Sequence, residues 1–141
     1  MTTGWHKYGV QLAVHSALAA AFAGLVSWLL AMRIWPAAAI WAVPTLGLMT
    51  RVAVLIRLRR MGWYAADESD RPSSAVVNRE MSKVFLVQLV GWLMVAAYSA
   101  ATGVWLGLGV SLALAYISLA VVRLLRRSAR RPGQTHGSEG R

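Results

Sequence analysis

Two ionisable side chains, His15 and Arg51, interrupt long apolar runs of the sequence. Ionisable groups inside a membrane span are costly, and those that occur usually serve a proton relay, an ion path or a cofactor. No carboxylate lies within any of the runs, which argues against a proton-driven pump built from this chain alone. A haem would need a second axial ligand, and the other histidines, His6 and His136, lie outside the runs. His15 and Arg51 could therefore form hydrogen bonds within the membrane or line a path for an anion.

The rest of the sequence offers no residues for catalysis. The absence of cysteine excludes thiol redox chemistry, thiolate metal sites and disulfides. The sequence contains no metal-ligand set, no pairing of a nucleophile with a base and no phosphate-binding glycine loop. We therefore predict that the protein is not an enzyme and has no catalytic, cofactor-binding or metal-binding residues.

Long apolar runs must position the polar side chains. The chain has 141 residues, of which 57% are hydrophobic, whereas soluble domains average about 45–50% apolar residues. This excess, with the charges placed between the runs, predicts an all-α membrane protein and excludes a disordered polycation or a soluble nucleic-acid-binding domain. The apolar stretch 84–125 is too long for one crossing and is expected to break near Gly103. We predict one transmembrane domain over residues 1–131, with four helices at about 9–32, 34–56, 84–102 and 105–125, a loop at 57–83 and a disordered tail at 132–141.

The cations predict the orientation of these helices. Lys and Arg in short loops remain on the cytoplasmic side of a membrane. All but Arg33 and Arg51 of the 15 Lys and Arg residues lie before the first run, between the second and third runs, or at the end of the fourth run and beyond it. An even number of crossings places these three segments on one side. We therefore predict two antiparallel helical hairpins with both termini cytoplasmic, in a bacterial inner membrane.

Four polar side chains lie at a similar depth in the predicted helices. His15 and Arg51 lie roughly 9 Å, and Gln88 and Ser118 roughly 7–8 Å, inside the cytoplasmic helix ends, from the α-helical rise. Unpaired polar groups in hydrocarbon are costly, so one hypothesis is a hydrogen-bonded cluster of these four residues. The alternative is that Arg51 extends to the headgroups and the others bond to local backbone.

Arginines recur along one side of the last predicted helix and continue past it. Their spacing of i, i+3, i+4, i+7 and i+8 would place them on one face of a continuing helix: Arg123, Arg126, Arg127, Arg130 and Arg131. Such a face attracts anionic lipid headgroups. Nucleic-acid binding is disfavoured because no aromatic residues for base stacking are interleaved, and docking to a protein partner is the remaining alternative. In the loop before the third helix, Ser73 or Ser74 could cap a short interfacial helix that runs into it.

Small residues at fourfold spacing predict where helices approach closely. Helix association in lipid relies on small residues because no hydrophobic force acts between helices there. The first run offers Ser16, Ala20 and Gly24, and the fourth offers a stripe of Gly103, Gly107, Ser111 and Ala115. We expect one of these seams to face outward and to join a second copy or another membrane subunit.

The segment from Arg79 to Lys83 resembles ATP synthase protein I, a small four-helix bacterial membrane protein family that assists assembly of the synthase rotor ring. Glu80 and Lys83 match the short Glu-x-x-Lys element at the start of that family's third helix, and Val10-Gln11-Leu12 and Pro44 fit its first and second helices loosely. The paired glycines usual in its second helix are absent, Arg79 replaces a common glycine, and the central loop is longer. The resemblance implies an assembly role.

These observations predict a protein that acts by binding, as an accessory, assembly or scaffold component of a larger membrane complex. The expected partners are anionic lipid headgroups and other membrane subunits or a second copy. One alternative is a small permease or channel component, in which His15, Arg51 and Gln88 line an anion path. Another is a plasmid- or phage-encoded helper of DNA spread or exclusion, whose basic face would meet a DNA-translocating machine.

Overall fold

The computed structural model describes residues 3–65, 67, 69 and 71–130, and these residues form four α-helices. The helices are α1 (Thr3–Ala31), α2 (Trp35–Arg60), α3 (Ser74–Ala101) and α4 (Trp105–Ala129). Each of them is long and apolar enough to cross a membrane. The tail expected to be disordered, 132–141, lies outside the described residues.

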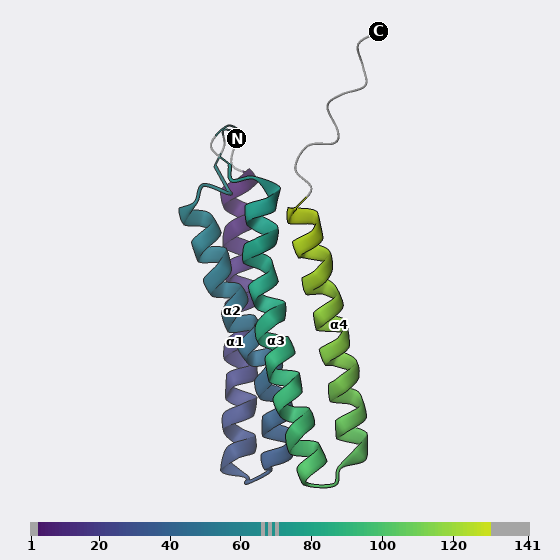
Figure 1. The fold of residues 1–141 in the computed structure, drawn as a ribbon. Helices are drawn as coiled ribbons and strands as arrows, with labels where there is room; N and C mark the ends of the chain where they lie inside the picture. The colour runs from purple at the N-terminus through teal and green to yellow at the C-terminus, as the bar shows by residue number, and fades with distance from the viewer. Residues whose placement is uncertain (1–2, 66, 68, 70, 131–141) are drawn as a thin grey trace.

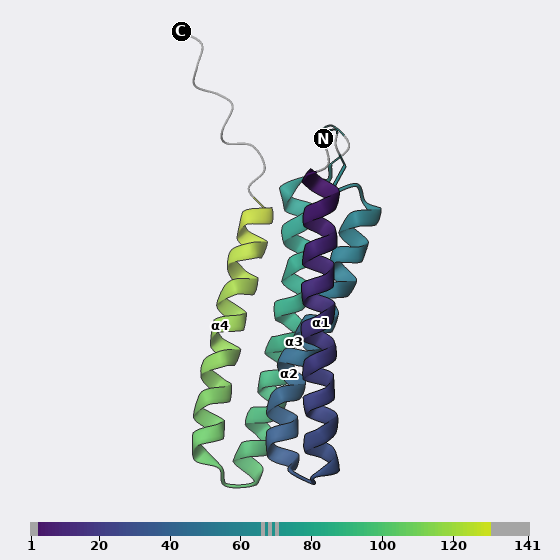
Figure 2. The same cartoon turned by 180° about the vertical axis from the view of Figure 1, so that it is seen from behind.

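The helices stand in a row in the order of the chain. Among the described helices, α1 packs on α2, α2 on α3 and α3 on α4, and no other pair comes close. Figures 1 and 2 show α4 beside α3 alone, whereas α1 lies behind α2 and α3 in Figure 1 and in front of them in Figure 2. The start of α1, the α2–α3 connection and the end of α4 lie together at one end of the row (Figure 1). The two outer helices therefore each have a single neighbour and present most of their surface outward.

The same backbone motif ends α1, α2 and α3. At each end a residue in the left-handed region is followed by an N–H that reaches back to the carbonyl five residues earlier, the Schellman arrangement that satisfies terminal carbonyls. Gly62 (φ 82°) and Gly103 (φ 73°) occupy this position after α2 and α3. After α1 the position is taken by Arg33 at φ 59°, which costs a non-glycine residue roughly 1–2 kcal/mol. After α1 and α3 the motif makes a short turn that folds the next helix back, and after α2 it begins the longer connection to α3.

One face of α1 packs on α2 along its whole length. Buried and half-buried residues recur alternately four and three positions apart, the period of a left-handed helix pair. Phe22 on this face meets Trp41 of α2 edge to face, with the ring centroids 5.4 Å apart. The face comprises Tyr8, Leu12, His15, Ala19, Phe22, Val26 and Leu29.

Two glycines allow α2 and α3 to approach closely. A Cβ atom on Gly91 of α3 would lie 2.9 Å from Cγ1 of Val43, a buried β-branched residue of α2. A Cβ atom on Gly47 of α2 would overlap the amide of Gln88 on α3. Glycine at position 91 is therefore required at this backbone separation, whereas a Cβ atom at position 47 would require the Gln88 side chain to move.

The interface of α3 and α4 is small and polar, and the outward surface is large and apolar. The α4 residues buried against α3 are Ser111, Ala115, Ser118 and Val122, and Ser82 and Ser99 of α3 are buried too. The exposed large side chains of these helices include Leu86, Val90, Leu93, Met94, Leu106, Val110, Tyr116 and Leu124. A water-soluble helix pair would place its large apolar residues in the interface. The opposite arrangement, with large apolar residues outside and small residues inside, is typical of helices surrounded by lipid.

The third helix begins ahead of its apolar run, at Ser74 rather than near residue 84, and the loop is correspondingly shorter than 57–83. Its first turns carry charges on one side but bury apolar side chains on the other. Val77 and Met81 pack with Met61 and Trp63 around the buried cluster of Val54, Leu58 and Val84. Ser73 is the N-cap residue, as one of the two predicted positions, although its side chain makes no capping hydrogen bond.

Candidate functional site

The four side chains of the expected polar layer lie on four helices of the row. His15 Nδ1 lies 2.6 Å from the carbonyl oxygen four residues earlier, and Ser118 Oγ donates to the corresponding carbonyl at 2.9 Å. Arg51 is exposed, and Gln88 lies at the close approach of α2 and α3. Within the described residues no hydrogen bond joins any two of the four, and α1 and α4 pack on different helices, so the four do not gather at one place. For His15 and Ser118 the bonds are therefore local.

The two predicted small-residue seams differ in what they meet. The α4 seam packs inside the molecule, where Gly107 lies against Ser99 and Ser111 is buried. Gly103, which was predicted to begin this seam, does not belong to it. It forms the α3–α4 turn, and no atom lies within 4 Å of its Cβ position. The α1 seam is exposed along Ser16, Ala20 and Gly24.

The predicted arginine face of α4 divides between two directions. Arg126 and Arg130 line a groove between the end of α4 and the start of α3, together with Arg79 and Lys83 of α3. The groove has a volume of about 700 Å³. Arg123 and Arg127 are exposed and do not line it. Arg131 lies outside the described residues.

A buried carboxylate, Glu80, pairs with the groove residue Lys83. Glu80 accepts hydrogen bonds from Lys83 Nζ at both carboxylate oxygens, each 2.7 Å long, and its Oε2 lies 3.6 Å from Nε of Arg57. Its side chain is 9% exposed, whereas those of Lys83 and Arg57 are 43% and 62% exposed. Glu80 belongs to a helix able to cross a membrane. The third helix is longer than the apolar run from which it was predicted, so it contains a carboxylate that the run does not.

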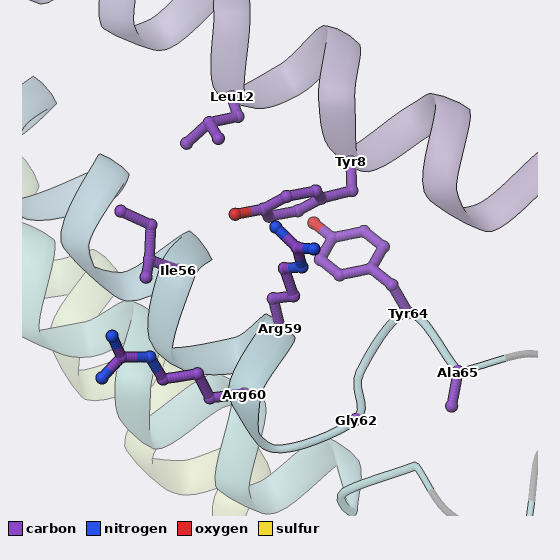
Figure 3. Close-up of a pocket in the computed structure, with 8 residues that line it drawn as sticks. All are labelled: Tyr8, Leu12, Ile56, Arg59, Arg60, Gly62, Tyr64 and Ala65. Carbon is purple, nitrogen blue, oxygen red and sulfur yellow. The ribbon is translucent and has the colours of Figure 1, made fainter.

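Two tyrosines and an arginine join α1 to the loop after α2. The rings of Tyr8 and Tyr64 lie 4.9 Å apart between centroids, and the guanidinium of Arg59 lies 5.1 Å from the Tyr8 ring centre (Figure 3). The Tyr64 hydroxyl donates to Oε1 of Gln11 at 2.9 Å. A groove of about 510 Å³ adjoins these rings, with Leu12 among its apolar lining residues (Figure 3). These contacts fix the first turns of α1 at the same end of the row as the arginine groove.

Two side chains of the loop after α2, Tyr64 and Asp67, have shifted pKa values. Burial, followed by the neighbouring Tyr8, raises the pKa of the Tyr64 hydroxyl, although Arg51 opposes the shift. The backbone N–H of Ser69 donates to Asp67 Oδ1 at 3.1 Å and holds the pKa of that carboxyl below its usual range. Tyr64 therefore remains a hydrogen-bond donor at neutral pH.

Sequence reasoning passed over Glu80 and Tyr64 as site residues. The signal for Glu80 was present, since a glutamate three residues before a lysine forms a pair on one helix face. Tyr64 gave no local signal, because its partner Gln11 lies 53 residues away in the chain. Comparison with protein-family models, curated proteins and solved structures finds no match to the chain.

Proposed function

We propose that this chain is a bacterial inner-membrane protein of two helical hairpins, with both termini cytoplasmic, that acts without catalysis as an accessory, assembly or scaffold subunit of a larger membrane complex. The proposed binding surface is the outward face of α1, which would pack against a helix of another membrane subunit or of a second copy.

The exposed seam of α1 carries this proposal. Gly24 has no atom within 4 Å of a Cβ position, and neither does Gly9 on the same helix. Ser16 and Ala20 between them are exposed as well. In contrast, the equivalent seam of α4 is filled by α3. Small residues in a membrane span allow a second helix to pack closely against them. The exposed α1 seam therefore favours a partner helix from outside the chain.

The distribution of charge supports the proposed orientation. The start of α1, the α2–α3 connection and the end of α4 lie at one end of the row (Figure 1). The last turns of α2 and α4 carry the basic residues Arg57, Arg59, Arg60, Arg126 and Arg127, and Arg130 is the C-cap residue of α4. Cations near span ends remain cytoplasmic, so this end is assigned to the cytoplasm. Cysteine-accessibility labelling of single cysteines at positions 67 and 103 tests the assignment, with reaction expected from opposite sides.

Co-purification in a mild detergent tests the proposed function. The tagged chain is isolated with its bound membrane proteins, which are identified by mass spectrometry, and the same is done for Gly24→Leu. Leucine at this position would hold a partner helix away from the seam, so we expect the partner to be lost. Gly109→Leu is the matched control, because Gly109 on α4 is also open and a side chain there disturbs nothing in the chain.

Two results would contradict the proposal. Equal recovery of the partner with Gly24→Leu and the unchanged chain would show that the seam does not bind it. Solute flux into liposomes that contain the purified chain alone would show that transport, rather than binding, is its activity.

A further inference from the structure

The groove between the start of α3 and the end of α4 concentrates positive charge at one place. Arg79 and Lys83 come from α3, and Arg126 and Arg130 come from α4. Glu80 is the neighbouring acid, and it accepts two of the three hydrogen bonds that the Lys83 ammonium can donate. The three arginines and the remaining Lys83 donor leave the groove strongly cationic. Its volume of about 700 Å³ lies within the range of roughly 300–1,000 Å³ typical of small-ligand sites.

We propose that this groove binds one anionic phospholipid that carries two phosphate groups. Arginine side chains from two helices can approach a phosphate as paired donors, which gives phosphate recognition both strength and geometry. Basic pockets between membrane helices on the cytoplasmic side are where lipid headgroups of this kind bind. The cations on opposite walls of the groove match a headgroup with two separated anionic centres.

The apolar lining of the groove favours a lipid over a soluble polyphosphate or a nucleic acid. Leu86 lines the groove about one helical turn beyond Lys83, toward the middle of α3, and it is 39% exposed. Val76 lines it at the opposite end and is also 39% exposed. Leu86 offers a place for the first part of an acyl chain as it enters the bilayer. None of the groove residues is aromatic, so base stacking has no platform there.

The inference rests on the proposed membrane orientation, which puts this groove at the cytoplasmic leaflet. It is separate from the proposed partner site, because the α1 seam lies at the other side of the row. Lipid binding by the purified chain in neutral detergent requires neither the partner protein nor a particular orientation. Failure of one proposal is therefore distinguishable from failure of the other.

Native mass spectrometry of the full chain in neutral detergent, titrated with cardiolipin or with phosphatidylcholine, tests the inference. We expect cardiolipin to be retained in preference to phosphatidylcholine. In Arg126→Gln/Arg130→Gln the cardiolipin affinity should fall about 25-fold, since each cation near an anionic group contributes about fivefold. The matched control is Arg123→Gln/Arg127→Gln, which removes the same charge from the same helix and should change the affinity less than about threefold, because distant cations are screened.

The variant Arg79→Gln tests whether the α3 side of the groove also binds the lipid, and it should lower the cardiolipin affinity about fivefold. All of these substitutions alter exposed side chains, and far-ultraviolet circular dichroism checks that each variant remains helical. Equal losses in the two double variants would overturn the inference, because they would indicate a general basic surface. No loss in Arg126→Gln/Arg130→Gln or in Arg79→Gln would also overturn it. Complete displacement of cardiolipin by inorganic pyrophosphate would reassign the groove to a soluble phosphate and contradict the lipid.

Discussion

Removing Lys83 should destabilise the protein more than removing Glu80, although both changes break the same ion pair. The Glu80 side chain is 9% exposed, whereas that of Lys83 is 43% exposed and that of Arg57 is 62% exposed. In Glu80→Gln the two cations can remain hydrated. The free energy of unfolding should therefore fall by about 1 kcal/mol, the range of a partly exposed ion pair. In Lys83→Gln the carboxylate stays enclosed, with Arg57 as its remaining cation at 3.6 Å.

The expected loss for Lys83→Gln is about 2–3 kcal/mol, below the roughly 3–5 kcal/mol of a fully buried broken pair because Arg57 remains. The double variant Glu80→Gln/Lys83→Gln should match Glu80→Gln to within about 0.5 kcal/mol, since no charge is then stranded. The free energy of unfolding is measured by titrating SDS into mild-detergent micelles and following helicity. Arg79→Gln removes a neighbouring exposed cation and should change the free energy by less than about 0.5 kcal/mol. A Lys83→Gln variant no less stable than Glu80→Gln would refute the reasoning.

Three further predictions concern the backbone and the loop. Gly91→Ala should lower the free energy of unfolding by about 1 kcal/mol, because overpacking of about 1–3 kcal/mol exceeds a helix-propensity gain of about 1 kcal/mol, whereas Gly109→Ala in open space should not lower it. Arg33→Gly should raise the melting temperature, since it relieves a left-handed conformation at φ 59°, and a lower melting temperature would contradict this. Tyr64 has a raised pKa, so its contribution to stability is complete below the unfolded pKa and is lost as the pH rises through the folded one. Tyr64→Phe should remove from an alkaline absorbance titration a phase that ionises above the ordinary range of tyrosine, and an unchanged titration would disprove the assignment.

The four helices follow from the apolar runs, but the polar first turns of α3 do not. A run of hydrophobic residues reveals where lipid contacts the chain, whereas a helix continues as long as its inner face finds packing partners. At Val77 and Met81 those partners come from α2 and the loop after it, which local sequence cannot supply. The beginning of α3 was therefore predicted too late, although the serine cap was among the predicted features.

The polar layer illustrates a second limit. Spacing along a helix gives the height of a residue but not its direction around the axis relative to helices that are distant in the chain. Four residues at one height can all meet only if the four helices form a closed bundle, and here the helices form a row. The same missing information explains why the sequence predicts two small-residue seams but does not tell that α3 covers the one on α4.

The row also determines how the protein can be built. In the part of the chain that the structure describes, every helix packs only on its immediate predecessor and successor. During synthesis each new segment thus finds its docking surface already in place, and none has to insert between two earlier ones. Such local connectivity is the kind associated with rapid folding. The finished molecule accordingly keeps its first helix as accessible at the end of synthesis as it was before the last helix emerged.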